Sequence, residues 1–280
     1  MFTFSFFAPK PKAKSKCNFL EITRLLIMDT FNYWFLITLA AVFVGMGKGG
    51  LPVIATLGVP TLSLIMSPIT AAGLLLPVYI VSDIFALSAY RRDFNWEILR
   101  IGMIGMTIGV IFGGLTAKFV IEWVVIFLIG IMGFLFSIEQ LTKRKNNKTR
   151  SHTEINSIKG YFWCSISGFT SFISHTGGPP WQIFTIPLGL KKSVFVGTSV
   201  IAFSYCNVIK VLPYLLLGQI NSISIYTSLI MAIPAILAVY LGVSLVKLIP
   251  EALFFKIVTW ALFSISIKLM WDGIKIPFNL

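Results

Sequence analysis

Two short glycine-rich stretches carry the residue types best suited to bind a ligand. They are GMGKGGLP at residues 45–52 and SHTGGPP at residues 174–180. Glycine lets the backbone approach a ligand and adopt positive φ, and proline in the first turn of a following helix costs no hydrogen bond. Free N–H groups at the start of such a helix, with the helix dipole behind them, attract anions. Both stretches therefore predict an anion-binding site.

Each candidate binding residue also has a structural interpretation. Glycine pairs can serve close helix packing, Lys48 can reach toward the membrane interface, and His175 can be a hydrogen-bonded packing residue. Asp83 either lines a pathway or partners Lys210 or a broken backbone segment. Polar residues such as Ser199 and Gln182 either join helices or face the site. The candidate substrate-binding residues are Lys48, Gly49, Gly50, Asp83, His175, Gly177, Gly178, Thr198, Asn207 and Lys210.

The composition indicates that a membrane surrounds the elements holding these residues. Of the 280 residues, 56% are hydrophobic and only 12% are charged, whereas soluble domains carry about a quarter charged residues. A bilayer solvates an apolar exterior, and each spanning helix needs about 20 apolar residues. We expect spanning helices at about 30–46, 68–90, 97–117, 121–142, 158–175, 193–217, 222–246 and 251–272.

Two apolar stretches, about 51–66 and 179–190, are short for a full span and contain Gly and Pro. We interpret them as broken or re-entrant segments, which must be buried in protein or face a water-filled cavity. The predicted fold is an all-α integral membrane protein with about eight transmembrane helices in two four-helix repeats. We expect an N-terminal arm (1–28), a first repeat (29–142), a basic loop (143–157) and a second repeat (158–280).

The repeat is visible as matched residues at a nearly constant offset. Gly49-Gly50 aligns with Gly177-Gly178, Asp83 with Asn207, Tyr90 with Tyr214, and Gly113 with Gly242. With an even number of helices in each repeat, the pseudo-twofold axis should lie along the membrane normal. Transporters are often built from such repeats, with the binding site where discontinuous helices meet.

Loop charge predicts the orientation. The N-terminal arm, the loop after the second helix and the loop at 143–159 are the most basic regions. Eight crossings would put all three on one side, which should then be cytoplasmic. Both termini would be cytoplasmic, and the arm would be loosely ordered unless the functional product starts near Met28.

Other function classes find little support. The net charge of +13 comes mainly from loops beside apolar segments, and no nucleic-acid-binding module is present. Cys17, Cys164 and Cys206 form no CxxC pair, so they predict neither a disulfide framework nor a metal site. The chain has no Walker, HExxH or GxSxG motif. We therefore expect no enzyme activity, no cofactor and no metal.

The chain resembles the sulfite exporter TauE/SafE family of bacterial membrane permeases over about residues 30–272. The matching stretches are residues 45–92 and 168–220, and the second contains GGPP, VGTS, Asn207 and PYLLLGQ in order. The resemblance implies an inner-membrane permease for small, often sulfur-containing anions such as sulfite and sulfonates.

The resulting expectation is a multi-pass inner-membrane protein that exports a small anion. Its partners would be that anion and the lipid bilayer, with no nucleic acid; the oligomeric state, homo-oligomers included, stays open. A non-transporting membrane protein, such as an assembly factor or a membrane-embedded enzyme, and an anion channel are the alternatives. Export is favoured because an inside-negative potential drives anions outward by about 2.3 kcal/mol per charge and 100 mV.

Overall fold

The structure is a computed structural model that describes residues 19–66, 68–117, 119, 121–145, 154–220 and 222–278. All regular structure in these ranges is helical. The chain divides into two compact units, residues 1–35 and residues 36–280. The first unit contains the beginning of α1, and everything described below concerns the second unit.

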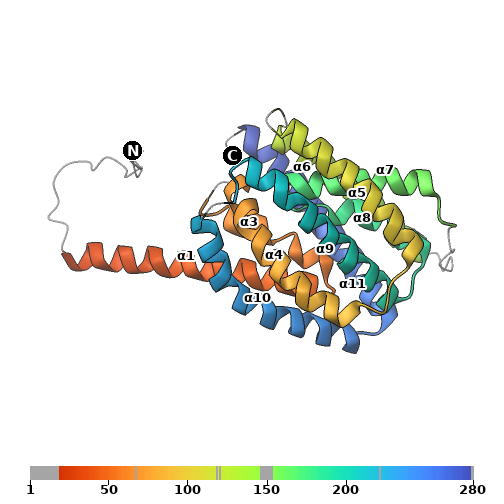
Figure 1. Cartoon of the computed structure of the whole chain (residues 1–280), viewed down its shortest axis with the longest axis horizontal. Coiled ribbons are helices and arrows are strands. Elements are labelled where there is room, and N and C mark those ends of the chain that lie inside the picture. Colours follow the sequence, from red (N-terminus) through yellow and green to blue (C-terminus); the bar gives the residue numbers. More distant parts are fainter. Residues whose placement is uncertain are drawn as a thin grey trace. The chain divides into compact units, whose positions relative to one another are not determined.

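The elements follow one another in an order that occurs twice (Figure 1). The first set is α1 (Phe19–Lys48), α2 (Pro52–Ala55), α3 (Gly58–Leu62), α4 (Pro68–Tyr90), α5 (Trp96–Thr116) and α6 (Glu122–Lys145). The second set is α7 (Ser157–Ser174), α8 (Gly178–Thr185), the 3-10 helix η1 (Ile186–Leu188), α9 (Lys192–Leu216), α10 (Ser222–Leu248) and α11 (Glu251–Phe278). In each set, one long helix and a short broken segment precede three further long helices.

Within the described ranges, seven helices are long and apolar enough to cross a membrane, so the chain is an all-α integral membrane protein. They are α1, α4, α5, α6, α9, α10 and α11. The other long helix, α7, is less apolar because its 18 residues include Lys159 and several serines and threonines. The predicted spans match the long helices within a few residues at most ends.

The largest differences from the predicted bounds lie near the termini. α1 begins at Phe19 rather than near residue 30, and α11 continues to Phe278. Residues 1–18 of the predicted arm, with Cys17, and residues 146–153 of the predicted basic loop lie outside the described residues.

The first broken segment turns the chain back along α1. A Cβ added to Gly47 would lie 2.8 Å from the Cα of Ala55, and one added to Gly58 would lie 3.2 Å from Val44. Residues 52–62 therefore run antiparallel to the end of α1. Together they form a helical hairpin, hairpin A (residues 36–62), that begins and ends at the same end of the bundle.

The second broken segment likewise turns the chain back, in this case along α7. The hydroxyl of Ser167 donates to the carbonyl of Gly177 at 2.7 Å, and a Cβ on Gly160 would lie 2.8 Å from the ring of Phe184. α8 thus returns alongside α7. This is hairpin B (residues 157–188). α7 runs parallel to α5 and α1 runs parallel to α10, while α10 runs along α4 and therefore opposite to α5. Hairpin B thus begins and ends at the end of the bundle opposite to hairpin A.

The two equivalent helices α4 and α9 cross at equivalent residues and run antiparallel. At their centre, the amide of Asn207 donates to Asp83 at 2.8 Å. Toward one end, a Cβ on Gly73 would lie 3.2 Å from the Cβ of Gln219. Residue numbers therefore rise along α4 while they fall along α9.

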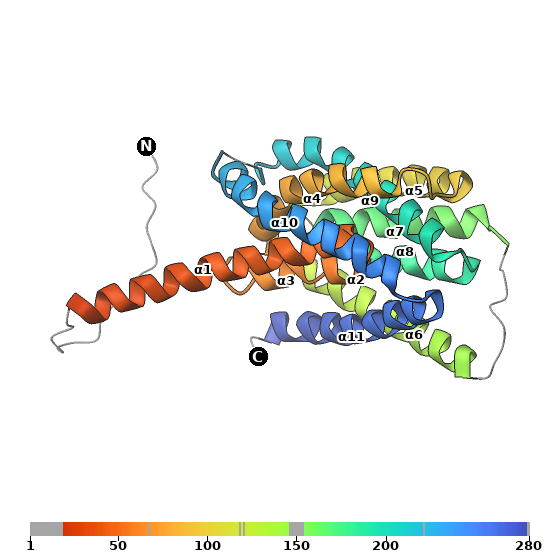
Figure 2. The same ribbon diagram turned by 90° about the horizontal axis from the view of Figure 1, so that it is seen from below.

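α6 and α11, which are also equivalent under the repeat, run antiparallel as well. Figure 2 shows these two helices side by side. The rings of Phe134 and Phe263 stack with centroids 5.3 Å apart, and a Cβ on Gly273 would lie 2.9 Å from the Cα of Phe127. These rings occupy equivalent positions of the two sets, as Asp83 and Asn207 do.

The expectation that the pseudo-twofold axis lies along the membrane normal is therefore wrong. Helices related by such an axis would be parallel, whereas α4 and α9, and α6 and α11, are antiparallel. The physical reason is that each broken segment returns as a hairpin instead of completing a crossing. Three helices per set then run through the bundle, and the odd number inverts the second set relative to the first.

Small residues hold the hairpins against the other helices. A Cβ on Gly49 would lie 2.5 Å from the carbonyl oxygen of Val239 and 2.7 Å from Gly242 in α10. On the opposite side, a Cβ on Gly109 in α5 would lie 2.6 Å from the backbone nitrogen of Phe169 in α7. Such close backbone approach is the usual way that helices associate in membranes.

Candidate functional site

The tips of the two hairpins meet at a small cavity. Hairpin A contributes Gly47, Lys48, Gly50, Ala55 and Thr56, and hairpin B contributes Ser171, His175 and Gly178. Tyr79 of α4 and Val196, Ser199, Val200, Phe203 and Asn207 of α9 complete the lining. The centre of a water-sized molecule can move through about 50 Å³ of it, which is enough for a few waters or one small ion.

The local backbone places two ionisable side chains at these tips. Lys48 lies in the last turn of α1, where the helix dipole favours a positive charge. His175 ends α7 in a left-handed conformation with φ 54°, a conformation that His adopts more readily than most non-glycine residues. Gly50, with φ 113°, provides the corresponding turn after α1.

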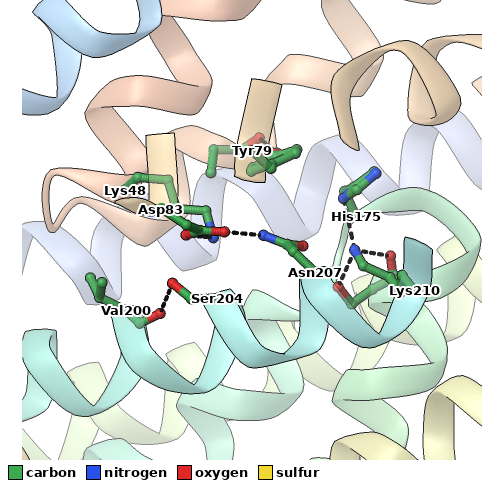
Figure 3. A network of polar contacts seen from close by, with 10 residues as sticks. Lys48, Tyr79, Asp83, His175, Val200, Ser204, Asn207 and Lys210 are labelled. Carbon is green, nitrogen blue, oxygen red and sulfur yellow. Dashed lines mark hydrogen bonds and ion pairs between the residues drawn. The ribbon is translucent and has the colours of Figure 1, made fainter. Parts of the chain in front are cut away.

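Lys48 is held in a buried ion pair (Figure 3). Its Nζ lies 2.6 Å from Oδ1 of Asp83, and the other carboxylate oxygen accepts the hydrogen bond from Asn207. The exposed fractions of Lys48 and Asp83 are 5% and 4%. Lys48 lines the cavity, whereas Asp83 lies behind it and does not.

A second buried cation lies behind His175. Lys210 has an exposed fraction of 0%, and its Nζ contacts the carbonyl and hydroxyl oxygens of Ser171 at 3.2 and 3.1 Å and Nδ1 of His175 at 3.0 Å. An ammonium group only donates, so Nδ1 accepts. Nε2 then carries the hydrogen and donates to the carbonyl of Ala72 at 3.1 Å.

Tyr79 separates the two ionisable tips. Nζ of Lys48 lies 5.3 Å from the centre of its ring, and the ring of His175 stacks on it with centroids 4.7 Å apart. The Tyr79 hydroxyl donates to the carbonyl of Ala55 at 2.9 Å. One aromatic side chain thus fixes the spacing of both hairpin tips across the cavity, as Figure 3 shows.

The charge distribution of this region favours an anion. Lys48 and Lys210 are buried with one carboxylate, Asp83, between the helices. Among the acidic residues in the described part of the chain, none forms an ion pair with Lys210. Buried charge is costly unless it is compensated, and a small anion in the cavity would supply the missing negative charge.

The starts of the short helices offer fewer backbone donors than the sequence predicted. Pro179 and Pro180 have no N–H, and the N–H of Trp181 donates to the carbonyl of Gly177. In hairpin A, the N–H of Gly50 donates to Gly47 at 3.2 Å. These N–H groups are therefore already used within the chain, and Lys48 is the charged side chain that lines the cavity.

Five of the ten predicted binding residues line the cavity: Lys48, Gly50, His175, Gly178 and Asn207. The other five do not. Asp83 and Lys210 contact lining residues from behind; the partner of Asp83 is Lys48, not Lys210. Their roles in binding stay predictions.

The remaining three residues, Gly49, Gly177 and Thr198, make packing contacts, and their roles in binding also stay predictions. Gly49 packs on α10, and a Cβ on Gly177 would lie 2.6 Å from the carbonyl oxygen of Ser167. Thr198 accepts a hydrogen bond from the N–H of Asn95 and donates to Val194. These contacts agree with the packing interpretation of those residues.

Several lining residues escaped the sequence prediction, above all Tyr79 and Phe203, whereas Ser199, which the sequence leaves open between a helix contact and the site, lines the cavity. The offset that aligns Asp83 with Asn207 also aligns Tyr79 with Phe203, so the repeat contained a signal for this pair. Ser199 accepts a hydrogen bond from the indole of Trp181 at 2.7 Å. Within the described ranges, no three His, Cys, Asp or Glu side chains gather to hold a metal.

Comparison with protein families gives a match that covers most of the chain. The family model described as "Sulfite exporter TauE/SafE" matches residues 34–269. No curated protein and no solved structure matches the chain. The matched range contains both hairpins, the cavity and all ten predicted binding residues.

Proposed function

The chain belongs to the sulfite exporter TauE/SafE family, and we propose that it exports a small anion through the cavity between the two hairpin tips. The family is one of membrane transporters, which supports transport over catalysis. The observation that carries the proposal is the small cavity at which two oppositely directed hairpins present Lys48 and His175. Its size suits a compact oxyanion or sulfonate.

The proposed substrates are sulfite, a sulfonate or a related organosulfur anion. The balance of buried charges supports this class, because two lysines but only one carboxylate are buried in this region of the described chain. An inside-negative membrane potential favours the exit of a singly charged anion by about 2.3 kcal/mol per 100 mV. Import of the same anion would require co-transported cations.

The helix directions change the orientation that loop charge favours. The end at which α4 and α6 finish and α7 and α9 begin carries Arg91, Arg92, Arg100, Lys159, Lys191 and Lys192. The positive-inside rule makes this end cytoplasmic, in the inner membrane of a bacterium. We therefore propose a cytoplasmic loop after α6 and an extracytoplasmic C-terminus, in place of the cytoplasmic C-terminus expected from eight crossings.

The test of substrate class is anion flux from proteoliposomes. Sulfite, thiosulfate, sulfoacetate and sulfate would be loaded in turn, and efflux compared with protein-free liposomes. We expect at least one of the sulfur anions to leave faster with the protein present, with a rate that saturates and that is stimulated by the same anion outside. Fast flux without saturation would favour a channel, and no flux of any anion would favour a non-transporting protein.

A further inference from the structure

We infer that Asp83 is the resident counter-ion of Lys48 and that a bound anion competes with it for the Lys48 charge. The inference rests on the proposed function for the identity of the physiological anion. Its basis is the placement of the three groups: Lys48 lines the cavity, while Asp83 contacts it at 2.6 Å from outside the cavity. An anion in the cavity would approach Nζ from the opposite side.

The hydrogen bonds around Asp83 fix it in this role. Asn207 holds Oδ2 at 2.8 Å, which leaves Oδ1 directed at Lys48. An ammonium group has three donors, and the carboxylate is the only charged partner of Lys48 among the described residues. Lys48 is thereby kept paired, and held near the ring of Tyr79, when no substrate is present.

The repeat shows that the fold does not require a carboxylate at this position. Asn207 occupies the equivalent place in the second set and lies directly against Asp83. The residue equivalent to Lys48 is Thr176, which is neutral. At these two positions, acid and base thus occur together in one set and are absent together from the other, which ties Asp83 to the charge of Lys48 rather than to helix packing.

A carboxylate beside the binding lysine has two effects on an anion. It neutralises part of the attraction that Lys48 exerts, and it repels the anion directly. Asp83 would therefore keep the affinity low enough for release while it prevents an unpaired lysine in the empty state. Removal of its charge should make anion binding tighter, the reverse of what loss of a direct substrate contact would do.

The experiment compares purified wild type, Asp83→Asn, Lys48→Met and the double variant, with Asp272→Asn as the matched control. Asp272 pairs with Lys268 in α11 and does not line the cavity. Sulfite affinity would be measured by calorimetry, and chloride at increasing concentration would be used as a second probe in thermal unfolding. Asparagine is nearly isosteric with aspartate and is the residue found at the equivalent position.

We expect Asp83→Asn to lower the dissociation constant for sulfite by tenfold or more, and Asp272→Asn to leave it unchanged. In the Lys48→Met background the same substitution should give a clearly smaller gain, which reflects the loss of direct repulsion alone, since the cycle isolates the coupling between the two residues. An unchanged or weaker affinity in Asp83→Asn, or an equal gain in both backgrounds, would overturn the inference.

A folding defect in Asp83→Asn is itself informative, because removal of one partner of a buried pair is costly. We then expect added chloride or the second substitution Lys48→Met to restore accumulation and the unfolding temperature. If neither does so, Asp83 has another role. The unfolding measurements with chloride test the role of Asp83 even if sulfite is not transported. In that case the proposed substrate class is wrong, and the inference about Asp83 is judged separately.

Discussion

At the residue scale, the candidate site contains two buried lysines that are held differently. Lys48 has a carboxylate partner and faces the cavity, while Lys210 has three neutral acceptors and stands behind His175. A direct role in binding is therefore easier to assign to Lys48. Lys210 contributes positive potential and fixes which nitrogen of His175 faces it.

Replacement of Lys48 should weaken substrate binding in proportion to the lost charge. We expect Lys48→Met to raise the apparent Km for the transported anion about tenfold or more, because a charge-assisted hydrogen bond contributes about 1.5–3 kcal/mol. Lys48→Arg keeps the charge and should have a smaller effect. The measurement is the concentration dependence of flux, with Lys268→Met as the control; equal, mild effects of all three variants would speak against substrate contact.

The glycines at the two tips should respond differently to substitution. A Cβ on Gly178 would meet nothing closer than Thr56 at 3.7 Å, so Gly178→Ala should accumulate normally and slow transport by narrowing the cavity. A Cβ on Gly50 would lie 2.8 Å from the Tyr90 hydroxyl and 2.9 Å from Val196, at positive φ. Gly50→Ala should therefore lower both the amount of protein and its unfolding temperature.

Membrane levels and flux per molecule would separate these two effects. Normal flux in Gly178→Ala at normal abundance would show that this part of the cavity is not used. Normal abundance and stability in Gly50→Ala would show that the turn tolerates a side chain.

Sequence alone could find the polar residues of the site but not their partners. A lysine, an aspartate and a histidine in apolar segments are conspicuous because each is costly there. Which of these residues are in contact depends on how the helices are rotated and where they cross. The sequence therefore does not show whether Asp83 contacts Lys210 or another group. Tyr79 was overlooked since one more aromatic residue in an apolar helix carries no distinguishing pattern.

At the element scale, the hairpins are held by backbone contacts of small residues. α5 presents Gly105, Gly109 and Gly113 to α7, and α10 presents Ala235, Ala238 and Gly242 to α1. These two contacts are equivalent under the repeat. They leave the tips, rather than the stems, as the part of each hairpin that a ligand can reach.

Two neighbouring glycines of α5 offer a matched test of this packing. A Cβ on Gly109 would lie 2.6 Å from the backbone of Phe169, while one on Gly114 would meet nothing closer than Pro213 at 3.5 Å. We expect Gly109→Ala to destabilise the protein by about 1–3 kcal/mol, the usual cost of overpacking, and Gly114→Ala to be nearly neutral. Thermal unfolding in detergent would show the difference, and similar unfolding temperatures would contradict the contact.

Hydropathy predicted the long helices well and their paths poorly. The spans at 68–90 and 222–246 agree with α4 and α10 almost to the residue, because an apolar stretch of membrane length has few alternatives to a helix. A hairpin stem such as α7 has the same length as a full crossing. Only contacts such as Ser167 with Gly177 show that the chain turns back.

At the scale of the whole molecule, the second set of helices is inverted relative to the first. The antiparallel pairs α4 with α9 and α6 with α11 establish this within residues 36–280. The sequence revealed the matched positions but not the inversion, since alignment of residues gives no helix direction. Inverted repeats around a central site suit a protein that exposes this site to the two membrane faces in turn.

Inversion makes a direct prediction about topology. Among the described helices between the loop after α6 and the C-terminus, α9, α10 and α11 run through the bundle, so these two regions should lie on opposite sides of the membrane. A reporter fused after Arg150 should read cytoplasmic, and one fused after Leu280 should read extracytoplasmic. If both reporters read cytoplasmic, hairpin B crosses the membrane completely and the inverted arrangement is wrong.

For the molecule as a whole, we propose that an anion passes outward through the Lys48 cavity under the membrane potential. The most direct test is sulfite efflux from proteoliposomes under an imposed potassium-diffusion potential at equal pH. We predict that an inside-negative potential accelerates efflux by wild-type protein and that Lys48→Met removes most of this efflux. Efflux that ignores the potential but follows a pH gradient, or that is unchanged in Lys48→Met, would contradict it.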